Sequence, residues 1–448
     1  MSEVYRLKKG LDIRLEGLSG TNMLDISLPA EFGLVPQDFR FITPKALVKP
    51  GEAVKAGTPL FYSKDNLRIR AGSPVSGVLK EIRRGERRVI ESFIIESDGK
   101  SESVALPRIN PALAEEVLTF FDDACLWPFI IQRPYGIIAN PAVTPRDIFI
   151  SGFDTSPLAP DMEILMKGCE PYLQAAVTAL SALTKGRVYV SVPLSKKGTS
   201  VFEKLNQVQI RYFSGPHPAG NVGVQIHHIE PLNKGETVWT VTPEGLVTIG
   251  KALTEQKYDT SRFIALAGSG FQRTGLVKTI SGASLAAYTA KNLSEGEKRI
   301  ISGNVLNGRN AVTAGYLGYN DRMVTAIPEG NFHEFLGWAM PGFNKFSHTR
   351  TFFSWLASRK KYDINTNYHG GERALVMTGE YEKVVPMDLY PQHLVKAVLV
   401  KDIELMEKLG IYEVIEEDLA LCDFVCTSKT EVQHIIRSGI EMMIKEMS

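Results

Sequence analysis

Four cysteines carry the most distinctive potential chemistry in the sequence, and only two of them lie close together. Cys422 and Cys426 form a C-x3-C pair, whereas Cys125 and Cys169 each stand alone. A structural zinc site or an iron–sulfur cluster needs about four ligands, usually in tighter pairs. We therefore expect reduced, structural thiols, because cytosolic cysteines are kept reduced.

Two adjacent histidines, His227 and His228, are the next candidates for metal binding. We interpret this segment as a strand, in which neighbouring side chains point to opposite faces. The two histidines are therefore not expected to share a metal ion. No Ser/His/Asp or Cys/His arrangement emerges from residue order or motifs, and no carboxylate pair stands out. The sequence therefore predicts no catalytic residue and no metal ligand.

A lysine at a predicted hairpin raises the alternative of a carrier protein. Residues 48–61 and 69–79 alternate strand patterns with glycine and proline turn signals, and they resemble the two halves of a biotinyl/lipoyl-type barrel-sandwich fold. Lys64 lies between the halves, where such carriers present their modified lysine. Its neighbours match neither the biotin-type Met-Lys-Met nor the lipoyl-type Asp-Lys-Ala pattern. A purely structural module is the preferred interpretation, because fold does not carry function with it.

A strand, a loop, a helix and a second strand follow in the central region. Residues 146–157 contain a buried strand and a polar loop, residues 163–184 have helical spacing, and residues 187–192 form the next strand. This βαβ order predicts a parallel sheet. Ligands bind at the carboxyl ends of such strands, so the loop at 151–158 is a predicted pocket wall.

The glycine pattern of a dinucleotide-binding loop is absent from this predicted wall. The nearest G-x-G is Gly268-Ser269-Gly270, and no helical pattern follows it. Without a helix to place its N–H groups on a pyrophosphate, this segment is expected to be a β-turn. A free-standing module that binds a nucleotide or a quinone remains an alternative.

An aromatic and basic stretch at 332–355 has the most unusual local composition. It holds eight aromatic residues, whereas aromatic residues make up 9% of the chain. Aromatic side chains beside arginine, with few carboxylates, are typical of interface cores and membrane rims. Three interpretations stay open: docking to a membrane subunit, core packing, or contact with a quinone head group. The candidate quinone or interface residues are Trp338, Phe343, Phe346, His348, Arg350, Phe353 and Trp355.

Size and composition indicate the general class of protein. The chain has 448 residues, a net charge of +1, 44% hydrophobic and 23% charged residues. These values are normal for a soluble globular protein of about three domains, and they give no electrostatic footprint for nucleic acid. No apolar run is long enough to cross a bilayer and no signal peptide begins the chain, so we expect a protein of the cytosol or of that face of a membrane.

The predicted fold class is multidomain α/β with four regions. Helical patterns at 394–409 and 429–447 follow the aromatic stretch. The predicted regions are an N-terminal region with the barrel-sandwich module (1–105), a Rossmann-like α/β domain (106–257), a β-grasp, SLBB-like module (258–330) and a C-terminal aromatic and helical region (331–448).

These modules, in this order, resemble the C subunit of the Rnf complex, and the last three resemble the flavin-binding subunit of respiratory complex I. The closer resemblance is to the NqrA family, the A subunits of sodium-translocating NADH:quinone reductases, and it spans nearly the whole chain. The segments that carry it are Lys8–Ile13, Ile301–Gly308, Gly337–Ser347, Glu372–Val376, Met387–Leu394 and Leu421–Cys426.

The resemblance implies a subunit of a translocase that oxidises NADH, reduces quinone and exports Na⁺. It implies a peripheral place on the cytoplasmic face of the bacterial inner membrane, with the membrane-embedded B subunit as chief partner and no independent catalytic activity. The flavin-binding relatives hold FMN with a glycine-rich loop and clusters with C-x2-C-x2-C sets, both missing here. We therefore expect no cofactor on this chain, with FMN, FAD, riboflavin and iron–sulfur centres on partner subunits.

Overall fold

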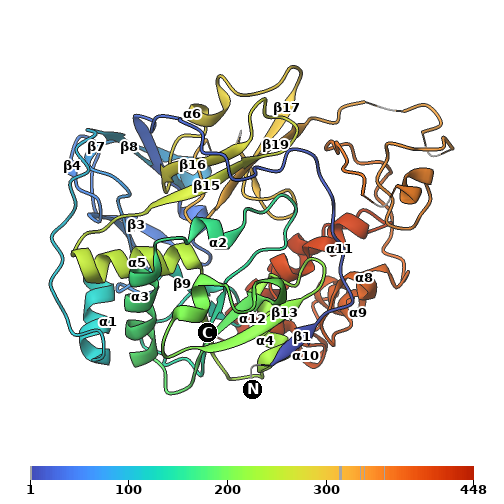
Figure 1. The fold of residues 1–448 in the computed structure, drawn as a ribbon. Coiled ribbons are helices and arrows are strands. Elements are labelled where there is room, and N and C mark those ends of the chain that lie inside the picture. The colour runs from blue at the N-terminus through green and yellow to red at the C-terminus, as the bar shows by residue number, and fades with distance from the viewer. Residues whose placement is uncertain (1–2, 312–314, 333, 338, 358, 448) are drawn as a thin grey trace.

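The computed structural model describes residues 3–311, 315–332, 334–337, 339–357 and 359–447. Within these ranges, four β-sheets and a C-terminal group of helices pack side by side (Figure 1). None of the helices in this part of the chain is long and apolar enough to span a bilayer. The boundaries of the four predicted regions remain predictions.

The N-terminal module consists of two small antiparallel sheets that face each other, as the barrel-sandwich prediction requires. Phe61 and Phe93, one from each sheet, stack with ring centroids 5.3 Å apart in the buried centre. The strands are β2 (Glu31–Leu34), β8 (Ile90–Ser97), β7 (Gly77–Arg84) and β4 (Ala53–Val54) in one sheet, and β3 (Pro44–Ala46), β5 (Pro59–Ser63) and β6 (Arg70–Gly72) in the other.

A seven-stranded mixed sheet forms the centre of the molecule. The predicted parallel pairing of the two central strands is confirmed, because runs of β-branched and aromatic residues such as Val188–Pro193 suit burial on both faces. In spatial order the strands are β1 (Val4–Arg6), β13 (Gln209–Ser214), β12 (Val188–Pro193), β11 (Ile148–Ser151), β14 (Val238–Val241), β9 (Ile130–Arg133) and β10 (Ile137–Ile138).

The helix predicted over 163–184 is two helices, so that prediction was wrong in its continuity. Gly168 has a left-handed φ of +82° and ends the first piece, and a proline in the first turn starts the second. The helices of this region are α1 (Ala114–Asp123), α2 (Met162–Leu165), α3 (Glu170–Ala182), α4 (Val222–Ile229) and α5 (Pro243–Glu255).

A five-stranded mixed sheet follows within the described residues, together with a short helix, as predicted for a β-grasp module. Its central strand β15 pairs antiparallel with β16 and parallel with β19. In spatial order the strands are β16 (Gly275–Ile280), β15 (Ser261–Ala267), β19 (Met323–Pro328), β17 (Lys298–Ser302) and β18 (Arg309–Asn310), and the helix is α6 (Ala286–Thr289).

The described part of the C-terminal region contains five α-helices, which follow the aromatic stretch. The helix predicted over 394–409 is again two, because Lys401 takes a left-handed φ of +59° and the Asp402 side chain caps a new helix. They are α8 (Glu380–Val384), α9 (Pro391–Leu399), α10 (Ile403–Lys408), α11 (Ala420–Val425) and α12 (Val432–Met447).

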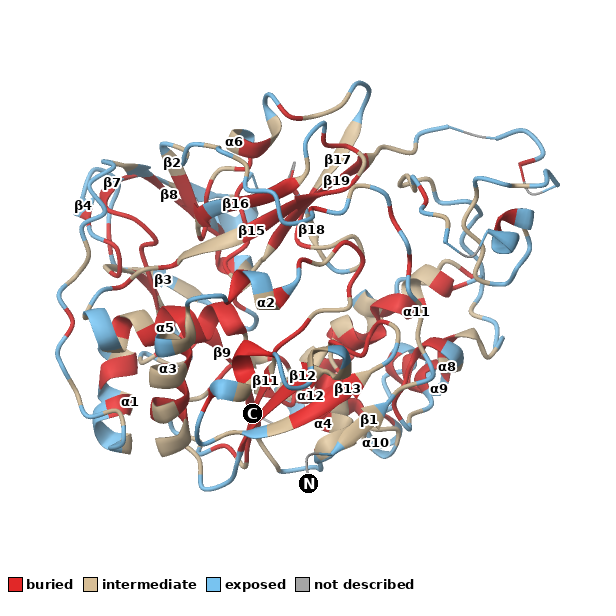
Figure 2. Cartoon of the chain, in the orientation of Figure 1, coloured by how far each residue is buried: buried red, intermediate tan, exposed pale blue. Residues whose placement is uncertain are grey.

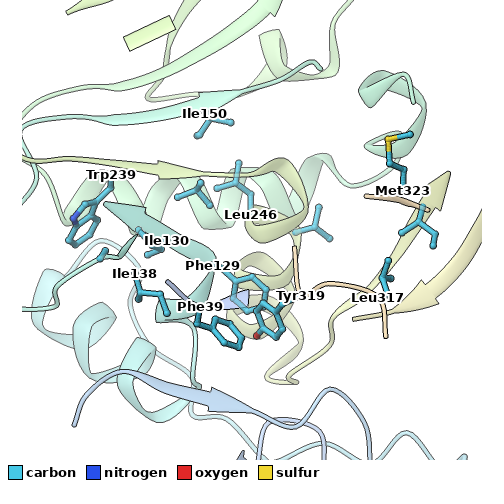
Figure 3. Close-up of a cluster of buried hydrophobic side chains, with 14 of the residues drawn as sticks. Phe39, Phe129, Ile130, Ile138, Ile150, Trp239, Leu246, Leu317, Tyr319 and Met323 are labelled. Atoms are coloured by element: carbon cyan, nitrogen blue, oxygen red, sulfur yellow. The ribbon is translucent and has the colours of Figure 1, made fainter. Parts of the chain in front are cut away.

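The three N-terminal modules share one hydrophobic core (Figure 3). The ring of Tyr319 from the β-grasp module packs edge-on against Phe39 of the barrel module, with centroids 4.8 Å apart, and stacks on Phe129 of the α/β domain at 5.0 Å. The Tyr319 hydroxyl lies 2.6 Å from that of Tyr258, so this buried polar group is satisfied. The modules therefore pack as one body.

An N-terminal strap, residues 4–24, crosses all of these parts and is drawn in blue in Figure 1. Beyond β1 it is mostly extended and pairs by backbone hydrogen bonds with segments far away in sequence. The bonds run from Leu7 N–H to Ser214 O, Gly10 N–H to Lys383 O, Glu16 N–H to Tyr362 O, Gly268 N–H to Gly17 O and Leu24 N–H to Leu276 O.

Buried ion pairs fasten the C-terminal helices to the rest. The Arg133 guanidinium, 3% exposed, donates to Asp418 at 2.7 Å and to Glu417 at 2.9 Å. The adjacent Glu416 accepts from Arg437 of α12 at 3.3 Å and lies 2.5 Å from Arg40 of the barrel module. A single acidic turn thus receives guanidinium groups from three modules.

Replacing Arg133 with methionine is expected to destabilise the chain strongly. The substitution leaves the fully buried Asp418 carboxylate without its charge partner, a loss of about 3–5 kcal/mol for one half of a buried pair. Thermal unfolding should show a lower midpoint for Arg133→Met. Lys408→Met is the matched control, because its pair with Glu404 is exposed and should matter little. Equal midpoints for the two variants would contradict this account.

Candidate functional site

The loop at 151–158, predicted as a pocket wall, leaves the carboxyl end of β11 and is held by the segment at 217–221. The Gly220 N–H donates to Thr155 Oγ1 at 2.9 Å, and the same oxygen lies 3.1 Å from His217 Nδ1. A Cβ on Gly220 would stand 2.6 Å from the Thr155 nitrogen. The two loops therefore touch backbone to backbone, and a side chain at Gly220 would push them apart.

His217 in this contact is buried. Burial lowers its pKa, outweighing the nearby carboxylates of Asp154 and Asp12. Its backbone N–H donates to Asp12 of the strap at 2.9 Å. The residue therefore joins the strap to the carboxyl edge of the sheet.

Two carboxylates and one guanidinium lie beside this loop. Arg322 of the β-grasp module reaches in to lie 3.5 Å from Asp154 and 3.6 Å from Glu244. Burial opposes the charge on Arg322, but Glu244 and Asp154 outweigh it and raise its pKa. Neither oxygen of the buried Glu244 carboxylate accepts a hydrogen bond within the described residues. The edge carries two carboxylates around this guanidinium, which disfavours a pyrophosphate.

The Gly268-Ser269-Gly270 segment is a turn between two strands, as predicted. It joins β15 to β16, and no helix lies between them. Gly268 has a left-handed φ of +103°, and a Cβ there would lie 2.1 Å from the Ala326 carbonyl oxygen. Close packing against β19 explains the glycine, and no phosphate needs to be invoked.

The two neighbouring thiols lie inside the C-terminal helices. Cys422 is in α11 and Cys426 follows its last residue, and both are buried and free. Burial raises the pKa of Cys422. At Cys426 burial has the same effect, but donation from the Tyr381 hydroxyl at 2.9 Å and from the Thr430 N–H at 3.3 Å outweighs it and lowers the pKa. Within the described ranges, no group of three His, Cys, Asp or Glu residues could hold a metal ion.

The adjacent histidines lie in a helix, so their assignment to a strand was wrong. Residues 222–229 form α4, and the short apolar run resembles a strand because it is only eight residues long. His227 Nδ1 lies 2.6 Å from the Glu413 carboxylate, and His228 Nε2 donates to the Pro386 carbonyl at 2.7 Å. Both rings therefore serve as links to the C-terminal region.

Lys64 lies at the hairpin where carrier proteins present their lysine. It follows β5 directly, is exposed, and its backbone N–H donates to the Thr43 carbonyl. Its position agrees with the prediction, and whether it is modified stays open to test.

The aromatic stretch extends away from the body of the molecule, at the right of Figures 1 and 2. Of the candidate residues, Phe343, Phe353 and Trp355 are 61%, 55% and 46% exposed. Phe346 is instead half-buried, with its ring 5.5 Å from those of Tyr362 and Phe424. The interpretation as an ordinary core therefore fits Phe346 and fails for the three exposed side chains.

The polar candidates in this stretch already have partners. The Arg350 guanidinium lies over the Trp355 ring, 5.5 Å from its centroid, and His348 Nε2 lies 3.3 Å from Glu380. Trp338 lies outside the described residues. The structure thus brings Arg350 and Trp355 together and Phe343 beside Phe353, whose rings are 6.0 Å apart, while His348 and Phe346 face the C-terminal region.

Further exposed apolar side chains enlarge this surface. We call the set the apolar docking surface, including Phe343, Phe353 and Trp355. Its other members are Phe332, Phe335, Leu336, Met340, Leu356, Tyr368, Val376 and Met377.

The residues that sequence reasoning missed are the charged ones of the domain contacts. Arg133 and Glu244 belong to the α/β domain and Arg322 to the β-grasp module, and all three are far apart in sequence. The acidic run at 416–418 is the only local signal, and by itself it resembles an ordinary solvated turn.

Comparison with protein families assigns the chain module by module. Residues 5–98 match the NqrA N-terminal barrel-sandwich hybrid domain, residues 112–258 the NqrA second alpha/beta domain, and residues 263–313 the NQRA C-terminal domain. These matches confirm the predicted fold class and its order of modules.

Full-length relatives carry one name. The chain is 38% identical to the A subunit of the Na(+)-translocating NADH-quinone reductase of Yersinia pestis bv. Antiqua, over 99% of this chain and 100% of the relative. It is 36% identical to the protein of the same name from Neisseria meningitidis serogroup B, with the same coverage. Among solved structures, an NAD⁺-reducing [NiFe]-hydrogenase in the air-oxidised state shows 10% identity and a TM-score of 0.35, covering 75% of this chain and 61% of that chain. The full-length identity shows that the chain belongs to the NqrA family, the A subunits of the Na⁺-translocating NADH-quinone reductase, which is a translocase complex.

Proposed function

We propose that this chain is the peripheral subunit, on the cytoplasmic face of the membrane, of a complex that oxidises NADH, reduces quinone and exports Na⁺. Its role is that of a scaffold that braces the membrane part of the complex. The observation that carries the proposal is the apolar docking surface, which leaves large aromatic side chains in solvent. Exposed apolar side chains that gather in one segment, as Phe343 and Phe353 do with their rings 6.0 Å apart, are typical of interaction sites.

The rest of the chain supports a scaffold. The shared core around Tyr319 and the ion pairs of Arg133 fix the modules to one another, and the docking surface extends from this rigid body. An ion pathway through a bilayer needs polar groups inside the membrane. We therefore assign Na⁺ movement to partner subunits, and the chief contact to the membrane-embedded B subunit.

We also propose that this chain holds no flavin and no iron–sulfur cluster of its own. Asp154 and Glu244 occupy the sheet edge where a dinucleotide or flavin phosphate would lie, and like charges there oppose a phosphate. Cys422 and Cys426 supply two thiols where a cluster needs about four. FMN, FAD, riboflavin and the iron–sulfur centre then belong to partner subunits.

Quinone contact is a weaker second candidate for the aromatic stretch. Its cationic and imidazole groups are engaged, Arg350 by Trp355 and His348 by Glu380. A quinone would have to displace one of these contacts to gain a donor. We therefore favour docking over a quinone site on this chain.

Removing the exposed aromatic side chains is expected to weaken assembly. The triple variant Phe343→Ser, Phe353→Ser and Trp355→Ser removes three large apolar side chains. Burying each of them against a partner contributes roughly 1.5–3 kcal/mol to binding. When the variant is co-expressed with the partner subunits, the amount that co-purifies with them should fall more than roughly tenfold.

The matched control replaces three comparably exposed apolar residues elsewhere, with Leu67→Ser, Val89→Ser and Leu113→Ser. This variant should co-purify like the unaltered chain. Normal assembly of the aromatic variant, or an equal loss in both, would refute docking through this surface.

The full chain expressed alone should be colourless and free of iron. Its visible absorbance spectrum and an iron analysis measure this directly. The double variant Cys422→Ser and Cys426→Ser should leave NADH oxidation by the assembled complex unchanged. A stoichiometric flavin spectrum, or iron that disappears with the two thiols, would overturn the assignment of cofactors to other subunits.

A further inference from the structure

An open pocket of about 410 Å³ lies where the N-terminal strap meets the end of the aromatic stretch. Its apolar wall is formed by Leu15 and Leu18 of the strap and by Leu158 of the loop after β11. Its charged rim is formed by Arg14, Arg359 and Lys361. Backbone hydrogen bonds between the strap and Tyr362 hold the two sides together. The pocket is therefore part of the fixed structure.

The three cations of the rim have no acidic partner. Arg14, Arg359 and Lys361 are exposed, and none forms an ion pair with any residue in the described ranges. The carboxylates nearest to them in sequence, Asp12, Glu16 and Asp363, do not line the pocket. The lining of the pocket thus combines three cations with apolar side chains and includes no carboxylate.

The charge bias continues into the aromatic stretch. Between residues 335 and 361 the sequence contains five lysines and arginines and no aspartate or glutamate. The same segment holds Phe343, Phe353 and Trp355, which are exposed. Exposed aromatic side chains beside cations, without carboxylates, are the composition of segments that lie at an anionic membrane surface.

We propose that this pocket binds an anionic phospholipid, with its phosphate between Arg14, Arg359 and Lys361 and its glycerol and upper acyl chain against Leu15, Leu18 and Leu158. The proposal rests on the function proposed above, which brings the chain to the cytoplasmic leaflet. A loop of a membrane protein fits the rim less well, because cytoplasmic loops carry an excess of Lys and Arg. Anionic lipid headgroups carry the opposite charge to the cations of the rim.

The test is co-sedimentation of the full chain with vesicles of phosphatidylglycerol and phosphatidylcholine, compared with vesicles of phosphatidylcholine alone. The unaltered chain should bind the anionic vesicles and not the neutral ones. The triple variant Arg14→Gln, Arg359→Gln and Lys361→Gln should bind roughly a hundredfold more weakly, the effect of three basic residues at an anionic surface.

The matched control removes the same charge from another part of the chain, with Lys100→Gln, Arg108→Gln and Lys257→Gln, all exposed. It should keep most of the binding. Equal loss in both triple variants would mean diffuse attraction by net charge and would overturn the pocket, as would absence of binding by the unaltered chain. Displacement of the vesicles by millimolar inorganic phosphate would mean a free-phosphate site and would also overturn it.

Co-purification with the partner subunits separates this proposal from the proposed function. The rim variant should still assemble, because the apolar docking surface is intact. If it assembles poorly but binds vesicles normally, the rim serves another protein of the complex and the lipid proposal fails. If the unaltered chain does not assemble at all, the proposed function fails, whatever the vesicles show.

Discussion

The packing of one aromatic ring, Tyr319, against its neighbours from two other modules is the contact on which the architecture depends. Because Phe39 and Phe129 both pack against this ring, the barrel, α/β and β-grasp modules cannot shift relative to one another without opening a void in the core. Dense interiors resist such voids. The rigidity that follows suits a protein whose proposed task is to hold other subunits in place, and it leaves the aromatic stretch as the part that reaches outward.

Ion pairs between modules add to the packing of the shared core. Guanidinium groups from three modules converge on the acidic turn at 416–418, and Arg322 fills the sheet edge together with Asp154 and Glu244. In a nucleotide-binding fold this edge would be kept open and rich in N–H donors. Here it is occupied by contacts between modules, which is consistent with the scaffold role proposed above.

Local patterns were enough to predict the strands around 48–79 and the parallel pairing of the two central strands, whereas the order of modules followed from the resemblance to known folds. Two features are determined by residues that are adjacent in sequence, so the sequence alone predicts them. They are the glycine and proline turns around 48–79 and the buried strand at 188–193. The breaks at Gly168 and Lys401 escaped prediction because helical spacing continues across both. Helix α4 escaped because the apolar residues Val222, Val224 and Ile226 alternate with other residues, a spacing that suits a strand equally well. Arg133, Glu244 and Arg322 could not be predicted, since their partners are set by tertiary contacts between distant segments. Exposure of Phe353 and burial of Phe346, in one short stretch, also depend on those contacts.

The N-terminal strap has a consequence for how the protein is made. Its first residues leave the ribosome before any of their partners, and those partners extend from Ser214 to Lys383. Contacts this distant in sequence form late, after domains that fold locally. The strap can therefore complete its contacts only after Lys383 has been made, and the pocket cannot form before Arg359 and Lys361 have been added. A chain that stops before residue 359 lacks two of the cations that line this pocket, together with Tyr362, the backbone partner of the strap at this point, so it cannot form the pocket.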